Sequence, residues 1–171
     1  MTNRILFYEK QSFRQWWLWV ILLIPITIFL FAAYSQIFKG EQFGNRPMSN
    51  QGLFIALGLT LAVGVLFTIM RLETVVTDEG ICVRFFPFHL SYRQYTWNSL
   101  NRFYVRTYKP LSEYGGWGLR QGFSGQGKAY NVAGYHGLQL EFTDKKRLLI
   151  GTQKPQELQR ILTKLQQPQL V

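Results

Sequence analysis

The chain has 171 residues and a net charge of +10, and 47% of its residues are hydrophobic. This length accommodates one domain of ordinary size with a smaller additional segment. Its single cysteine, Cys82, excludes an intramolecular disulfide and agrees with a reducing compartment. The only histidines, His89 and His136, fall in separate predicted segments, so we predict no metal site and no cofactor.

Two uncharged apolar segments follow a short head, residues 1–15. "WWLWVILLIPITIFLFAAY" covers residues 16–34 and "GLFIALGLTLAVGVLFTIM" covers residues 52–70. About 20 such residues cross the hydrocarbon core of a bilayer, so we predict a transmembrane hairpin over residues 16–70 with a polar outer loop at 35–51. The alternative is a pair of buried helices in a soluble protein, although buried helices seldom lack a polar stripe over this length.

Lys and Arg are distributed unevenly about these two spans. Three precede the first span, two lie in the loop, and fourteen follow the second span. By the positive-inside rule, we expect a multi-pass protein of the plasma (inner) membrane with both termini in the cytoplasm. A cleaved signal peptide ending near Ala33 is the competing interpretation of the first span, but the long lead and long apolar stretch exceed the usual dimensions of such a peptide.

Small side chains recur at every fourth residue of the second span, at Gly52, Ala56, Thr60 and Gly64. A face of this kind permits the close approach of another helix. We expect it to pack against the first span. A seam between two copies of the chain is the alternative.

From residue 71 on, apolar residues alternate or form short blocks bounded by turn residues, a pattern typical of strands. A helix then begins at Pro155, where one stripe of apolar side chains recurs with helical spacing. The predicted strands are residues 72–77, 80–86, 90–96, 102–108, 117–123, 128–132, 137–142 and 147–151, and the stripe consists of Leu158, Ile161, Leu162 and Leu165.

A run of seven or eight short antiparallel strands closed by one amphipathic helix is the layout of a pleckstrin-homology-like (PH-like) barrel. "TVVTDEGICVRFFPF", "TWNSLNRFYV" and "LLIGTQKPQELQRIL" resemble bacterial PH-like domains that follow paired membrane helices. "VRTYKPLSEYGGWG" and "KAYNV" resemble a small prokaryotic family of two-span membrane proteins. The resemblance covers nearly the whole chain and implies a cytoplasmic PH-like domain over residues 71–171, but almost nothing about activity.

The stretch "KPLSEYGGWGLRQGFSGQGKAYNV", residues 109–132, is rich in glycine but lacks the spacing of phosphate-binding loops, and no helix follows it. We expect its glycines to serve strand reversal and close backbone approach. Its aromatic and basic side chains either cover the barrel or form a contact site for a protein partner or the membrane surface. The candidate contact residues are Arg106, Lys109, Tyr114, Trp117, Arg120 and Lys128.

No grouping of nucleophile, base or paired carboxylates is evident, so we predict no catalytic residues and no enzyme activity. Basic residues alternate with aromatic ones along predicted strands, which indicates a solvated face rather than nucleic-acid binding. We expect a membrane-anchored binding or scaffolding module that contacts a protein partner or a second copy of itself, and we identify no small-molecule substrate. The alternatives are a sensor of anionic lipid surfaces and an accessory subunit of a membrane transporter, although the spans contain no charge.

Overall fold

The computed structural model describes residues 4–123 and 125–166 and divides into two compact units. One is a helical unit, Phe13–Ile69, and the other is a β-rich unit made of the residues up to Ser12 and from Met70 on. The sequence prediction of two long apolar helices, a mainly-β domain and a C-terminal helix is confirmed. The domain boundaries differ, because the predicted separate head belongs to the β-rich unit.

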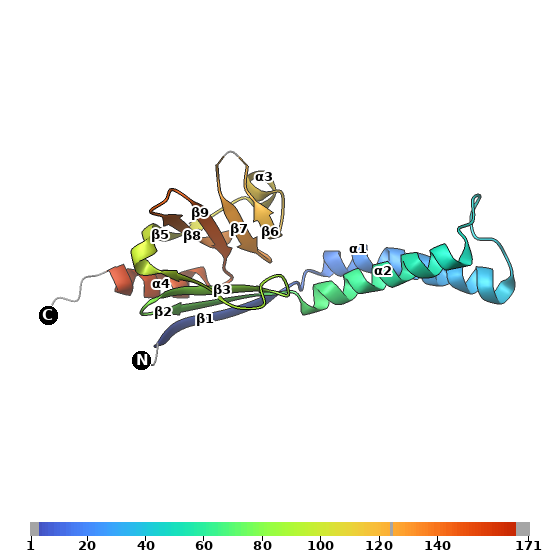
Figure 1. The fold of residues 1–171 in the computed structure, drawn as a ribbon, viewed down its shortest axis with the longest axis horizontal. Helices are drawn as coiled ribbons and strands as arrows, with labels where there is room; N and C mark the ends of the chain where they lie inside the picture. The colour runs from blue at the N-terminus through green and yellow to red at the C-terminus, as the bar shows by residue number, and fades with distance from the viewer. Residues whose placement is uncertain (1–3, 124, 167–171) are drawn as a thin grey trace. The chain divides into compact units, whose positions relative to one another are not determined.

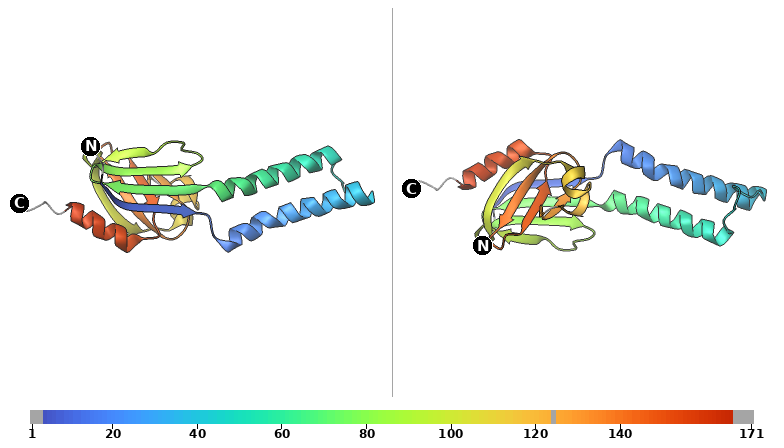
Figure 2. Two further views of the ribbon diagram at one scale, coloured as in Figure 1. Left: turned by 90° about the horizontal axis from the view of Figure 1, so that it is seen from below. Right: turned by 90° about the horizontal axis from the view of Figure 1, so that it is seen from above.

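The helical unit is an antiparallel pair, in which α1 (Trp16–Tyr34) and α2 (Asn50–Ile69) lie side by side (Figure 2). A π-helical turn, η1 (Ser35–Lys39), extends α1. Both helices are long and apolar enough to span a membrane. A Cβ added to Gly64 would lie 3.7 Å from Cδ1 of Ile26, so this part of the small-residue face packs on α1.

The first sheet of the β-rich unit is antiparallel and has the order β1-β2-β3-β4. Its inner face is apolar because alternate side chains of β2 and β3 point to the same side. The strands are β1 (Ile5–Ser12), β2 (Arg71–Thr77), β3 (Gly80–Phe86) and β4 (Arg93–Thr96), and their fully buried side chains include Leu72, Val76, Ile81, Val83 and Phe85.

Strand β1 lies before the helical unit in the chain but pairs with β2, which follows that unit (Figure 1). Ser12 is the register partner of Arg71, so the chain leaves and re-enters the sheet at adjacent positions. The sequence pattern does not predict this strand. Its buried face holds Phe7, Glu9 and Gln11, and two polar residues out of three do not give an apolar alternation.

Polar contacts join β1 to the C-terminal part of the chain. Gln11 Nε2 donates to the carbonyl oxygen of Gly151 at 2.7 Å. The carboxylate of Glu9 accepts from the hydroxyl of Thr152 at 2.7 Å and from the backbone N–H of Gln153 at 2.8 Å. Glu9 is 5% exposed, so these contacts satisfy a carboxylate that would otherwise be buried without partners.

The second sheet has the order β5-β8-β9-β7-β6. All of its pairings are antiparallel except that of β7 with β9, which is parallel. A short helix, α3 (Pro110–Tyr114), precedes β6, and a 3-10 turn, η2 (Trp97–Ser99), leads into β5. The strands are β5 (Leu100–Thr107), β6 (Gly118–Gln121), β7 (Lys128–Asn131), β8 (His136–Phe142) and β9 (Arg147–Gly151).

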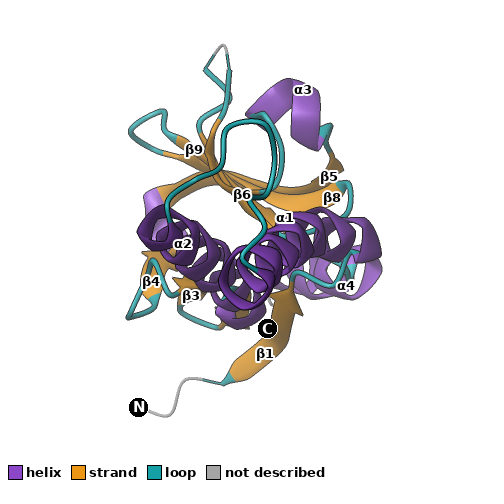
Figure 3. Cartoon of the chain, turned by 90° about the vertical axis from the view of Figure 1, so that its right-hand side faces the viewer, coloured by secondary structure: helices purple, strands orange, loops and turns teal. Residues whose placement is uncertain are grey.

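The predicted closed barrel is wrong: the two sheets share no strand ladder within the described part of the chain. The reason lies at β9, which has β8 on one side and β7 on the other. With both of its edges occupied, β9 cannot pair with β1, and a hydrogen bond from the side chain of Gln11 to the carbonyl oxygen of Gly151 links those two strands instead. Figure 3 shows the sheets as separate layers, with α4 (Pro155–Gln166) on one side of them and β4 on the other.

Two groups of apolar side chains hold the second sheet. Leu158 and Leu162 of α4 are buried, whereas Ile161 and Leu165 at the borders of the predicted stripe are only partly buried. On the opposite face of the sheet, α3 and its neighbours form a cluster of Tyr108, Tyr114, Ala129 and Leu149. Strand β9 is therefore covered on both faces, which explains its continuous run of buried residues.

Candidate functional site

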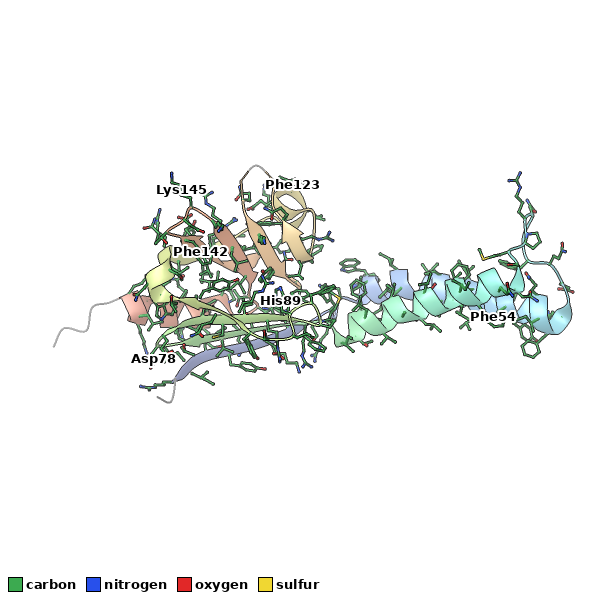
Figure 4. The ribbon with its side chains drawn as sticks, in the orientation of Figure 1. Phe54, Asp78, His89, Phe123, Phe142 and Lys145 are labelled. Atoms are coloured by element: carbon green, nitrogen blue, oxygen red, sulfur yellow. The ribbon has the colours of Figure 1, made fainter. Side chains whose placement is uncertain are left out.

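A cavity of about 460 Å³ opens between the β4 edge of the first sheet and the second sheet. Arg93 and Tyr95 reach it from β4, and Lys128 and Tyr130 reach it from β7. Each pair is two residues apart, so strand alternation brings both members to the same face. The turn between β8 and β9 provides the third side, with Phe142 at its base and Lys145 at its tip (Figure 4).

Aromatic rings line the interior of the cavity. The rings of Tyr95 and Phe142 meet edge to face with centroids 5.2 Å apart. The guanidinium of Arg93 donates from Nη1 to the hydroxyl of Tyr130 at 3.1 Å, which orients both side chains. Burial, and then the neighbouring Tyr130, raises the pKa of Tyr95 to about 12, so the Tyr95 hydroxyl stays neutral and can donate or accept a hydrogen bond.

Positive charge predominates around the cavity. Its lining includes one acidic residue, Asp144, which pairs with Lys146 at 2.6 Å. Within the described residues, neither Arg93 nor Lys128 has a carboxylate partner within 4.0 Å. The five basic lining residues are Arg93, Lys128, Lys145, Lys146 and Arg147. The site therefore favours an anionic ligand.

A smaller hollow of about 280 Å³ shares Arg93, Lys128 and Tyr130 with the cavity. It adds the guanidinium of Arg120 and the imidazole of His89 to the lining. Arg93 and Lys128 thus stand between two adjoining hollows and contribute positive charge to both.

His89 lies on the connection between β3 and β4 and is almost fully buried (Figure 4). Its Nδ1 accepts from the backbone N–H of Phe85 at 3.3 Å, and its ring packs edge to face on Tyr130 with centroids 5.1 Å apart. Burial, followed by the charges of Arg93 and Lys128, lowers the pKa of His89. The imidazole is therefore neutral at neutral pH, as its acceptor role at Nδ1 requires.

We expect the free energy of unfolding to decrease as the pH falls from about 7 to about 5. Because the folded pKa of His89 lies below the ordinary value of 6.5, the unfolded chain takes up the proton first, and protonation favours unfolding in this range. Denaturant unfolding at a series of pH values measures the slope, which His89→Asn should flatten. Equal slopes for the wild type and His89→Asn would contradict the expectation.

Several residues proposed from the sequence as contacts take part in the structure of the second sheet. Arg106 donates to Glu113 at 2.7 Å, to the hydroxyl of Tyr114 at 3.2 Å and to Gln139 at 3.0 Å. Burial opposes ionisation of Glu113, but the hydrogen bonds from Arg106 and the backbone of Lys109, together with the charges of both residues, outweigh it, and the pKa of Glu113 lies below its usual value. Arg106 thus fastens α3 to the sheet, and the side chain of Tyr114 is buried rather than presented to a partner.

The other proposed contact residues lie on different parts of the β-rich unit. Lys109 precedes α3, and its backbone N–H donates to Glu113 at 2.7 Å. Trp117 donates from Nε1 to the carbonyl oxygen of Gly134 at 3.4 Å, and Arg120 donates to the carbonyl oxygen of Trp117 at 2.9 Å. Of the six proposed residues, Lys128 lines the larger cavity and Arg120 the adjoining hollow.

At Gly127, the glycine-rich stretch allows a close backbone approach. Gly127 has φ +80°, and a Cβ there would overlap the carbonyl oxygen of Arg147 on β9. Only glycine allows β7 to enter the sheet beside β9 in this conformation. This positions Lys128, the next residue, at the cavity.

No sequence motif marks Arg93, Tyr95, Phe142 or the basic run Lys145-Lys146-Arg147 as site residues. In the sequence, this run lies between the predicted strands 137–142 and 147–151 and at the first residue of the second. The positive charge of this run is the feature of the sequence that could indicate a binding site. The other residues of the site lie on β4 and β7, and the packing of the two sheets brings them close to the run.

The described residues contain no group of three or more His, Cys, Asp and Glu side chains that could hold a metal ion. Burial, followed by the charge of Glu79, raises the pKa of the Cys82 thiol, which keeps it protonated. The buried Glu73 forms ion pairs with Arg71, at 3.0 Å, and with Arg84. Its carboxylate also accepts a hydrogen bond from the hydroxyl of Tyr92 at 2.7 Å. Its negative charge is therefore balanced by neighbouring basic side chains.

A scan of protein-family models finds none that matches this chain, and a search of curated proteins finds no match either. Function is therefore inferred from the site and the chain's organisation.

Proposed function

We propose that this protein is a membrane-anchored binding module without catalytic activity, in which two transmembrane helices hold a PH-like domain at the cytoplasmic face of a plasma membrane. The observation that carries the proposal is the insertion of an apolar helical hairpin between neighbouring strands of one sheet. Because Ser12 and Arg71 are register partners, the hairpin can leave and return without interrupting the sheet.

The exposure of the helices supports a lipid environment. In the most apolar stretch of the first helix, 6% of the residues are buried, and in the most apolar stretch of the second helix, 11% are buried. A core helix in a soluble protein would bury most of its apolar side chains. Large side chains such as Ile24 and Leu59 remain more than half exposed, and a surface of this kind requires lipid or another protein around it.

The pairing of β1 with β2 supports two crossings. A chain that crosses a membrane twice returns to the side from which it started, and both strands belong to one folded unit. Cleavage of a leader within the first span would instead remove β1 from the sheet. The excess of Lys and Arg outside the loop then favours the cytoplasmic side for the folded unit.

The PH-like assignment is supported by the succession of a four-stranded antiparallel sheet, the antiparallel strands β5, β8 and β9, and the final helix α4. The β6–β7 hairpin is an addition at the free edge of β9. It also forms one wall of the basic cavity, which makes that cavity the preferred binding site of the module.

A second candidate function, sensing of an anionic membrane surface, is favoured by one observation: the cavity's basic lining. Lys and Arg near a bilayer are attracted to anionic lipid. The set of Arg106, Lys109, Arg120 and Lys128 proposed from the sequence is less suited to this role as a whole, because Arg106 is engaged by Glu113.

Cysteine labelling tests the membrane topology. In a Cys82→Ser background, we expect Gln42→Cys to react with a membrane-impermeant maleimide in intact cells, and Tyr8→Cys and Gln153→Cys to react only after permeabilisation. All three side chains are exposed in the structure, so reactivity reports the side of the membrane. Labelling of Tyr8→Cys and Gln153→Cys on opposite sides, or the reverse pattern, would exclude the proposed arrangement.

A further inference from the structure

We propose that the loop between β3 and β4, residues 87–92, inserts two apolar side chains, Phe88 and Leu90, into the interfacial layer of the same membrane that α1 and α2 span. The partner of this surface is the lipid bilayer itself. The inference rests on the proposed membrane anchorage. It adds a third point of contact with the bilayer, which fixes the orientation of the β-rich unit on the membrane surface.

Strand register places the base of this loop near the point where the chain leaves the second span. Phe86, the last residue of β3, is the register partner of Arg71, and Arg71 comes two residues after Ile69, the end of α2. Paired Cα atoms of antiparallel strands lie about 4.5–5.5 Å apart, and two residues of chain reach at most about 7 Å. The base of the loop therefore lies within about 13 Å of the last residue of α2, whatever the angle between the two units.

The loop exposes two large apolar side chains and carries no charge. Leu90 is 79% exposed and Phe88 is 56% exposed. The segment 87–92 contains no Lys, Arg, Asp or Glu, and its histidine, His89, is buried. Such a loop enters the interfacial layer without removing an ion from water, and the transfer of its apolar side chains from water to lipid is favourable.

The loop holds these side chains outward through hydrogen bonds at both of its ends. The backbone N–H of His89 donates to the carbonyl oxygen of Phe85 at 2.8 Å, and Nδ1 of His89 accepts from the backbone N–H of Phe85 at 3.3 Å. The hydroxyl of Tyr92 donates to the buried Glu73 at 2.7 Å. The exposed residues on either side of His89 are therefore presented by an ordered loop, so little conformational freedom is lost when they contact lipid.

The surroundings of the loop suit the interfacial layer. Aromatic rings and long basic side chains are both favoured there. At the base of the loop, Cζ of Arg71 lies 4.8 Å from the centroid of the Phe86 ring, and Cζ of Arg84 lies 4.5 Å from that of Tyr92. Because the two spans already hold the loop at the membrane, insertion is an intramolecular step. The contact depends on the burial of apolar side chains and requires no particular headgroup.

The test measures contact with lipid in the full-length chain. The protein, with Cys82→Ser, is placed in phosphatidylcholine nanodiscs, and Val65→Cys, Leu90→Cys and Ile5→Cys each receive an environment-sensitive fluorophore. All three side chains are more than half exposed. Val65 lies in α2, and Ile5 pairs with Thr77, at the end of β2 that lies roughly 20 Å along the strand from its first residue. The quencher is phosphatidylcholine that carries a nitroxide on an acyl chain close to the headgroup.

We expect the nitroxide lipid to lower the fluorescence of Val65→Cys and Leu90→Cys at least about twofold and that of Ile5→Cys by less than about a tenth. Quenching at Val65→Cys but not at Leu90→Cys overturns this proposal and leaves the anchorage intact. No quenching at Val65→Cys overturns the proposed function together with this inference. Equal quenching at Leu90→Cys and Ile5→Cys also overturns the inference, because the contact would not belong to the loop.

A second measurement asks whether the apolar side chains cause the contact. The label is moved to Ser91→Cys, which we expect to be quenched in the otherwise unchanged chain and to lose that quenching when Phe88→Ser and Leu90→Ser are added. The matched control, Ile5→Ser with Leu111→Ser, removes two other exposed apolar side chains and should leave the quenching unchanged. An equal effect of the two pairs overturns the proposal. A label at the loop that is unquenched but blue-shifted also overturns it and identifies a protein surface as the cover of the loop.

Discussion

Deletion of residues 1–12 is expected to abolish the cooperative unfolding of the β-rich unit. Strand β1 covers one edge of β2 along its whole length, from the pair Ile5–Thr77 to the pair Ser12–Arg71. It also brings the buried ring of Phe7 and the buried carboxylate of Glu9 into the unit. This deletion should be the most damaging single change considered for this protein.

The expected magnitude follows from the interactions lost. Burying one large apolar side chain contributes roughly 1.5–3 kcal/mol, and a hydrogen bond to a charged group contributes about 1.5–3 kcal/mol. Phe7 and the two hydrogen bonds of Glu9 together approach the whole stability of a domain, about 5–15 kcal/mol. The edge of β2 would in addition expose its unpaired backbone groups.

Two soluble chains make the test direct. The first, called the linked chain, has a short turn containing Asn-Gly in place of Phe13–Ile69. The adjacency of Ser12 and Arg71 permits this replacement. The other begins at Met70 and lacks β1. Circular dichroism and tryptophan fluorescence should show one sharp transition on heating for the first chain and a gradual change for the second.

A smaller change isolates the link between β1 and the C-terminal segment. Glu9→Ala should lower the free energy of unfolding by about 1–3 kcal/mol, whereas Lys10→Ala, exposed on the same strand, should change it by less than about 0.5 kcal/mol. A chain without β1 that unfolds as sharply as the linked chain would show that β1 is not part of the folded unit.

Replacement of both Leu158 and Leu162 by alanine is expected to unfold most of the β-rich unit. These side chains are 1% and 0% exposed, and each truncation of a buried leucine costs about 2–5 kcal/mol. The sum is comparable with the stability of the domain, about 5–15 kcal/mol. Urea unfolding of the linked chain measures the effect.

The matched control for this pair is Lys164→Ala, an exposed position on the same helix that keeps its helical propensity. Ile161→Ala should fall between the two extremes, because Ile161 is partly exposed. A double variant with the urea midpoint of the control would mean that α4 does not close the core between the sheets.

The local pattern of apolar and polar residues is sufficient to predict most of the helices and strands of this structure. The predicted spans at residues 16–34 and 52–70 agree with α1 and α2 to within two residues, and the predicted helix start at Pro155 agrees with α4. The strands from residue 71 on are also predicted by the pattern, and no strand end differs by more than three residues. These features depend on apolar runs, alternation and turn residues, which act between near neighbours in the chain.

Two features depended on contacts between distant segments. Glu9 is stable in the core only because Thr152 and Gln153, more than 140 residues away, supply donors, so no local pattern marks β1 as a strand. The barrel expected from a simple meander fails because β7 takes the outer edge of β9.

The candidate site belongs to the same class of features. The sequence determined that the β-rich unit is basic and that its side chains alternate along strands. Only the tertiary structure decided which basic residues meet, because Arg93 and Lys128 approach each other through the packing of two sheets. The net charge of a unit can be counted from its sequence. A cavity forms only when folding brings segments that are distant in sequence together in space.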